Sequence, residues 1–141
     1  MRERALSLDL ETKQPCLRVE LFVTDVRVSL TYYVEALGFR VLRDDPSGYV
    51  SVGREGVVIG LSRADRLPDD HPVKALPGER LGRGVELVVA VVDIEGAYAQ
   101  ALASGRPIQA PLQARSWGLT DFRMLDPDGY YVRLTSLSQQ P

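Results

Sequence analysis

The sequence predicts an α+β fold in which two tandem βαβββ modules form curled mixed sheets around a shared cavity. Three observations support this prediction. Two strand-like stretches are each followed by an aspartate and by a segment with helical spacing that ends at a glycine. Three short strand candidates follow each helix, and the intervals Asp25 to Gly38 and Asp93 to Gly105 nearly match. An internal repeat of this kind indicates two copies of one structural unit.

Residues 17–24 form the first predicted strand, because apolar and polar side chains alternate along it. Asp25 stands where a helix N-cap belongs, since its carboxylate can accept hydrogen bonds from free backbone N–H groups. Gly38 supplies the left-handed stop at the end of the helix. Apolar side chains at helical spacing mark the buried face of this helix: Val26, Leu30, Tyr33, Val34 and Leu37.

The rest of the first module consists of three strand candidates, residues 39–43, 49–52 and 57–61, separated by the turn signals DDPSG and GREG. Residues 63–83 are rich in proline, glycine and charge, and we interpret them as a linker. The linker contains His71, the only histidine, in the pattern PDDHPV that is typical of a solvated loop.

The same order of elements returns after the linker. VELVVAVV at 85–92 predicts a strand, Asp93 an N-cap, and Gly105 the end of a second helix. The buried face of that helix is predicted to contain Ile94, Ala97, Tyr98, Ala101 and Leu102. Three further strands are predicted, with the turn DPDG before the last of them: residues 108–112, 119–125 and 130–135.

The chain of 141 residues is long enough for one domain with a sizeable core. We divide it into an N-terminal tail, a first module, a linker, a second module and a C-terminal tail. These parts comprise residues 1–16, 17–62, 63–83, 84–137 and 138–141.

Composition argues against several classes of protein. The formal charge of −2 gives no basic footprint for nucleic acid. The longest apolar run, 87–92, is too short to span a bilayer, and the N-terminal stretch lacks the apolar segment of a secretory signal. A single cysteine, Cys16, excludes an intramolecular disulfide framework and a Cys-rich zinc site. We therefore expect a cytoplasmic protein without a nucleic-acid or membrane partner.

Three segments together resemble the vicinal oxygen chelate superfamily. VELFVTDVRVSLTYYVEALGFRV resembles its opening strand–Asp–helix signature, and VVDIEGAYAQALASG resembles its second-module helix. SWGLTDFRMLDPDGYYVRL resembles its closing segment, with Trp-Gly followed by Asp-Pro-Asp-Gly. The resemblance covers roughly residues 17–137 and implies paired βαβββ modules. The superfamily includes glyoxalase I, extradiol dioxygenases, fosfomycin-modifying enzymes and bleomycin-resistance proteins.

The enzymes of this superfamily hold a divalent metal through His, Gln or Glu on the first and last strand of each module. The resemblance places Arg18 and Glu86 at the first-strand positions, and Gly60 and Arg133 at the last-strand positions. A guanidinium has no lone pair for a metal, and one carboxylate does not make a metal site. We therefore expect neither a metal nor another cofactor, although a shifted register would place Glu20 where Arg18 is expected.

Strand alternation directs Arg18, Glu20, Glu86 and Arg133 into the expected cavity. Two interpretations remain open: the four side chains neutralise one another, or they anchor a charged ligand. Trp117, the only tryptophan, is either a stacking platform for a flat ligand or a packing or interface residue. The candidate ligand-binding residues are therefore Arg18, Glu20, Phe22, Tyr49, Glu86, Trp117, Tyr131 and Arg133.

The leading interpretation is a metal-free small-molecule-binding protein similar to the bleomycin-resistance proteins, which sequester an antibiotic. Their closing motif resembles DPDG with Arg133-Leu134 after it. A planar or cationic ligand would bind in a groove at a homodimer interface, because short two-module chains of this family commonly pair. The alternatives are a lyase, isomerase or dioxygenase with unusual metal ligands, a metal-free enzyme using Glu20 or Glu86 as general base, and a protein-interaction role.

Overall fold

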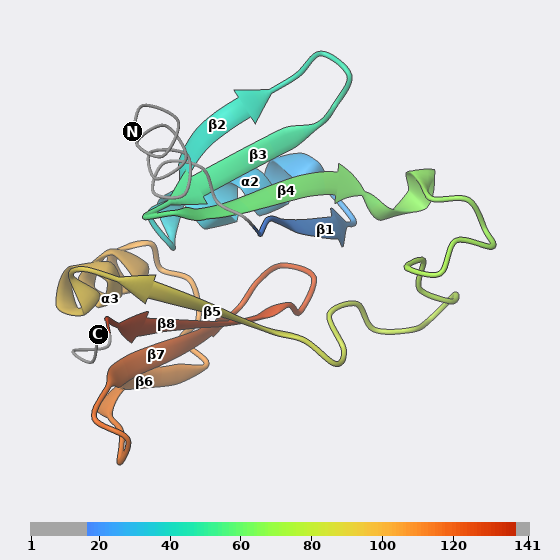
Figure 1. Cartoon of the computed structure of the whole chain (residues 1–141). Helices are drawn as coiled ribbons and strands as arrows, with labels where there is room; N and C mark the ends of the chain where they lie inside the picture. Colours follow the sequence, from blue (N-terminus) through green and yellow to red (C-terminus); the bar gives the residue numbers. More distant parts are fainter. Residues whose placement is uncertain (1–16, 138–141) are drawn as a thin grey trace, which may run out of the picture.

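The structure is a computed structural model that describes residues 17–137, and it contains two modules with the same order of elements (Figure 1). The first module comprises β1 (Val19–Val23), α2 (Val26–Glu35), β2 (Arg40–Asp44), β3 (Val50–Arg54) and β4 (Val57–Arg63). Its four strands form one sheet in the order β1-β4-β3-β2. β1 runs parallel to β4, and the other neighbouring strands are antiparallel.

The second module repeats this arrangement. It comprises β5 (Glu86–Val91), α3 (Ile94–Ala103), β6 (Ala110–Ala114), β7 (Thr120–Leu125) and β8 (Tyr131–Ser136). The sheet order is β5-β8-β7-β6, with β5 parallel to β8. Between the modules, a short 3₁₀ helix at Ala64–Arg66 leads into turns that reach β5, and this connection extends to one side of both sheets (Figure 1).

The predicted N-caps and glycine stops explain where both helices begin and end. The Asp25 carboxylate accepts hydrogen bonds from the N–H groups of Arg27 and Val28, and Asp93 accepts one from Gly96. Gly38, with φ of +74°, allows the backbone turn that a side-chain-bearing residue rarely adopts.

The buried face of α2 differs from the predicted one. Tyr33 and Val26 are buried as expected, but Tyr32 is also buried, with only 3% of its surface exposed. The reason is that α2 contacts β2, β3 and β4 on one side and the second module on the other. A helix covered on two sides buries more than the single apolar stripe that its sequence pattern shows.

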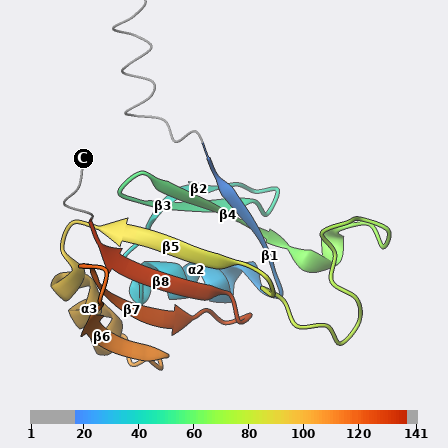
Figure 2. The same ribbon diagram turned by 60° about the horizontal axis from the view of Figure 1, so that its bottom comes forward.

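Contacts between the modules involve α2, the turns next to the sheets and the end of α3. The Tyr33 hydroxyl donates to Asp126 at 2.8 Å, and the Tyr130 hydroxyl donates to the backbone oxygen of Phe22 at 2.8 Å. Three further contacts join the same parts: Thr24 with Asp128, Val92 with Glu55, and Gln100 with the carbonyl oxygens of Val34 and Glu35. Figure 2 shows α2 lying beside the second sheet.

The predicted fold class is confirmed: two four-stranded mixed sheets and two helices form tandem α+β modules. The two sheets are not closed around one cavity within the single chain, and β1 and β5 remain as edge strands. No helix in residues 17–137 is both long enough and apolar enough to cross a membrane. The predicted tails, 1–16 and 138–141, and Cys16 lie outside the described residues.

Candidate functional site

Each sheet has one face against a helix and an opposite face that no helix covers, which we call the helix-free face. On β5, Leu87 and Val89 are buried, whereas Glu86 and Val88 are exposed on the opposite side. Residues that pair directly across neighbouring strands share a face. The polar residues predicted from the sequence as ligand-binding candidates lie on these two helix-free faces.

On the first sheet, Glu20 of β1 lies directly opposite Gly60 of β4. The Glu20 carboxylate occupies the space that a Cβ atom at Gly60 would need. Residue 60 must therefore be a glycine for the carboxylate to lie this close to the backbone of β4. The Tyr49 hydroxyl donates to this carboxylate, at 3.2 Å from Oε1 and 3.3 Å from Oε2. Burial raises the pKa of Tyr49, and the adjacent negative charge of Glu20 raises it further.

On the second sheet, Nη2 of Arg133 donates to Oε1 of Glu86 at 2.8 Å, joining β8 to β5. Tyr131 pairs directly with Glu86 across the same strands. Its hydroxyl donates to Oε1 of Gln109 at 3.3 Å and accepts from Nη1 of Arg123 at 3.4 Å. Glu86 is therefore already neutralised by an arginine of its own sheet.

A second ion-pair network lies beside this pair, around Asp121 of β7, whose side chain is fully buried. Arg115 donates to Oδ1 of Asp121 from Nε at 3.0 Å and from Nη2 at 2.9 Å. Arg123 donates from Nε at 3.2 Å. Arg123 also lies directly opposite Arg133, an unfavourable pairing of like charges that Asp121 and Glu86 offset.

The chain matches a family model over residues 16–134, and the model describes the glyoxalase/bleomycin resistance protein/dioxygenase superfamily. This match covers most of the chain and coincides with the two modules. The chain belongs to this superfamily. Among proteins with curated descriptions, none matches it.

Several solved structures share the fold. TioX from Micromonospora sp. ML1 is 23% identical with a TM-score of 0.66, over 89% of this chain and 98% of that one. A glyoxalase/bleomycin resistance protein/dioxygenase from Nocardioides is 21% identical with a TM-score of 0.67, over 100% and 96% of the two chains. A protein of unknown function from Agrobacterium tumefaciens str. C58 is 25% identical with a TM-score of 0.67, over 86% and 92%.

The residues at the superfamily's metal positions do not fit a divalent metal. Glu20, and not Arg18, lies opposite Gly60, because Arg18 precedes the first residue of β1. On the second sheet, the Glu86 carboxylate accepts a hydrogen bond from the guanidinium of Arg133, which itself has no lone pair for a metal. Residues 17–137 contain no group of three or more His, Cys, Asp or Glu side chains placed to hold a metal ion.

The eight candidate residues fall into separate groups. Within the described chain, Glu86 pairs with Arg133 and Glu20 with Tyr49, and the hydrogen bonds of each pair stay within one module. Phe22 lines a cavity of about 220 Å³ together with Tyr49. Trp117 lies apart, in the turn between β6 and β7, with 56% of its surface exposed.

Sequence reasoning missed Asp121 and its two arginines. A signal was available, because DPDG predicts a tight turn and alternation along 119–125 places Asp121 and Arg123 on one face. Pairing that strand with the next one brings Arg123 opposite Arg133. The position of Arg115 had no comparable signal, since it lies in the turn after β6.

Proposed function

We propose that this superfamily member binds a small planar or cationic molecule without a metal ion, and that it sequesters this molecule rather than transforming it. The observation that carries the proposal is the Arg133–Glu86 pair, at two positions where the resemblance to superfamily enzymes implies metal ligands. An arginine at such a position removes a ligand and also neutralises the remaining carboxylate. The arrangement favours a polar binding surface over a metal centre.

Glu20 is the carboxylate best placed to receive a positive group. It is exposed, and its hydrogen-bond partner among the described residues is the neutral Tyr49 hydroxyl. Glu86, by contrast, already accepts from Arg133. Phe22 and Tyr49 provide aromatic surface beside Glu20. A cationic ligand with a planar part therefore has a charged partner and an apolar contact on the first sheet.

A groove at a homodimer interface would bring this surface together with the second sheet of another copy. The edges β1 and β5 border an apolar cavity of about 520 Å³, and Leu17, Val85 and Val88 along it are exposed. Exposed apolar side chains beside unpaired strand edges indicate a surface that another chain covers. A second copy is the simplest occupant, because a two-fold pair buries the same edges on both chains.

Titration with bleomycin tests the proposal. In the presence of EDTA, metal-free bleomycin is expected to quench the fluorescence of Trp117, the only tryptophan, with a saturable curve. Glu20→Gln should weaken binding about tenfold or more, since a hydrogen bond to a charged group contributes roughly 1.5–3 kcal/mol and 1.4 kcal/mol is a factor of ten. Calorimetry on the same samples measures affinity independently of the fluorescence.

The matched control is Glu95→Gln, which changes the net charge equally but lies on α3. It should bind bleomycin like the wild type, and a neutral analogue of the drug should be insensitive to Glu20→Gln. The absence of saturable binding by calorimetry, or equal losses for the charged and neutral compounds, would contradict the proposal.

Sedimentation tests the dimer separately. The protein is expected to sediment as a dimer at micromolar concentration, and Val88→Asp should shift it towards monomer because it places a charge on the covered edge. Val41→Asp is the control, since Val41 and Val88 are both 48% exposed but Val41 lies on β2, the outer strand. A monomeric wild type would refute the paired groove.

A further inference from the structure

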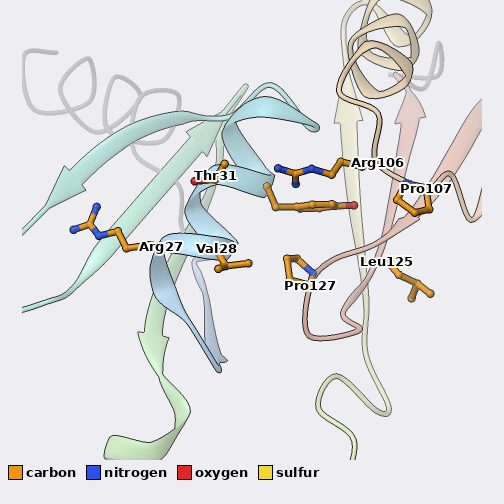
Figure 3. Close-up of a pocket in the computed structure, with 8 residues that line it drawn as sticks. Arg27, Val28, Thr31, Arg106, Pro107, Leu125 and Pro127 are labelled. Carbon is orange, nitrogen blue, oxygen red and sulfur yellow. The ribbon is translucent and has the colours of Figure 1, made fainter.

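A further cavity lies between α2 and the second module. Its volume is about 510 Å³, within the range of small-molecule sites. Val28 of α2 forms one apolar wall, and Pro107, Leu125 and Pro127 form the other (Figure 3). Val28 and Leu125 are 50% and 40% exposed, so the free protein presents apolar surface to solvent here.

Two guanidinium groups border this cavity, and they differ in how firmly they are held. Arg27 makes two short hydrogen bonds to Asp44, at 2.8 and 2.6 Å, so its charge is engaged. Arg106 makes one long contact to Glu35, at 3.4 Å, and its guanidinium lies 5.3 Å from the centre of the Tyr32 ring. Arg106 is thus the cation that an anionic ligand could engage without breaking a strong ion pair.

Tyr32 supplies a second, independent indication of a ligand. Its side chain lines the cavity and is 97% buried, and its hydroxyl has no hydrogen-bond partner among the described residues. Buried hydroxyl groups in native proteins nearly always have a partner, and an unpaired one calls for an explanation. An acceptor oxygen in this cavity would satisfy the hydroxyl.

We propose that this cavity binds a small carboxylate with an apolar body. The carboxylate accepts hydrogen bonds from Arg106 and from the Tyr32 hydroxyl, and the apolar body packs against Val28, Leu125 and the two prolines. Neither the Glu20–Tyr49 pair nor the Glu86–Arg133 pair lines this site, and it does not depend on the function proposed for them.

The test uses 2-naphthoate as the probe and 2-naphthamide as its neutral counterpart. Titrations of the ¹⁵N-labelled full chain should show saturable amide shifts at Val28, Arg106 and Leu125 with naphthoate, and at least tenfold weaker binding of the amide. Arg106→Gln should weaken naphthoate binding about tenfold, whereas Arg27→Gln, which alters the engaged guanidinium, should change it much less. Tyr32→Phe removes no hydrogen bond within residues 17–137 and should also weaken binding.

Three results would overturn the proposal. The first is that the amide binds as tightly as the carboxylate. The second is that the shifts fall at Arg123 and Arg133, the arginines of the helix-free face, instead of at Val28, Arg106 and Leu125. The third is that Arg106→Gln and Tyr32→Phe both bind naphthoate like the wild type, while circular dichroism shows them to be folded.

Discussion

Replacing Asp121 by alanine is expected to lower the free energy of unfolding by about 3 kcal/mol, the lower end of the range for removing one partner of a buried ion pair. Asp121 is fully buried and accepts hydrogen bonds from both Arg115 and Arg123. Without it, two guanidinium groups that are only about one-fifth exposed lose their counter-charge. Arg123 then faces Arg133 with only Glu86 to offset the repulsion. Urea unfolding measures the loss.

The same carboxylate predicts how stability depends on pH. Burial by itself would raise the pKa of Asp121, but the hydrogen bonds and charges of Arg123 and Arg115 outweigh it and hold the pKa below the usual value. The ion pair therefore contributes stability above the unfolded-state pKa, and this contribution is lost as the pH falls through the lower folded-state pKa. Asp121→Asn should therefore make the free energy of unfolding less dependent on pH in the acid range.

The exposed pair of Arg27 and Asp44 is the matched control for this prediction. It has the same side chains and a bidentate geometry, at 2.8 and 2.6 Å, but it lies in solvent. Exposed ion pairs contribute little to stability. Asp44→Ala should therefore leave the urea midpoint nearly unchanged. A loss equal to that of Asp121→Ala would show that burial is not the cause.

Removal of the Asp126 side chain is expected to cost a comparable amount, about 3 kcal/mol, because it leaves buried donors without acceptors. Asp126 is 4% exposed and accepts from the Tyr33 hydroxyl at 2.8 Å and from the Tyr130 N–H at 2.9 Å. The first of these bonds joins α2 to the β7–β8 turn, so Asp126→Ala weakens the junction between the modules. Thermal and urea unfolding of the variant test this expectation.

Asp128 provides the control in the same turn. It accepts from the Thr24 hydroxyl at 2.6 Å and also joins the modules, but in an exposed setting. Asp128→Ala should destabilise the protein less than Asp126→Ala. A double-mutant cycle of Tyr33→Phe with Asp126→Asn isolates the buried bond, and additive effects of the two changes would contradict a coupling between them.

The pH dependence of Asp126 has the opposite sign to that of Asp121. Burial raises the pKa of Asp126, although the Tyr130 N–H, the Tyr33 hydroxyl and the Asp128 N–H all favour its ionised form. A carboxyl whose folded-state pKa is raised loses stability as the pH rises from the unfolded value through the folded value. In the wild type, the contributions of the two aspartates to the pH dependence of the free energy of unfolding therefore partly cancel. Unfolding Asp121→Asn and Asp126→Asn separately as a function of pH measures each contribution.

The elements of both modules were predictable because their signals are local. The alternation of β1, the N-caps Asp25 and Asp93 and the stop at Gly38 act within a few residues of chain. The strand boundaries shifted by one or two residues, as for β2, predicted at 39–43 and found at Arg40–Asp44. Such shifts reflect pairing with the neighbouring strand, which local propensity does not encode.

The sequence by itself determined the tandem modules and the superfamily, because these depend on repeated local patterns. Only the tertiary structure decided which charges meet. It placed Glu20 over Gly60 and Glu86 against Arg133, and it buried Asp121 between two arginines from different segments. It also buried Tyr32 beside Arg106. These contacts depend on the packing of one module against the other and on strand register, which join residues far apart in the chain.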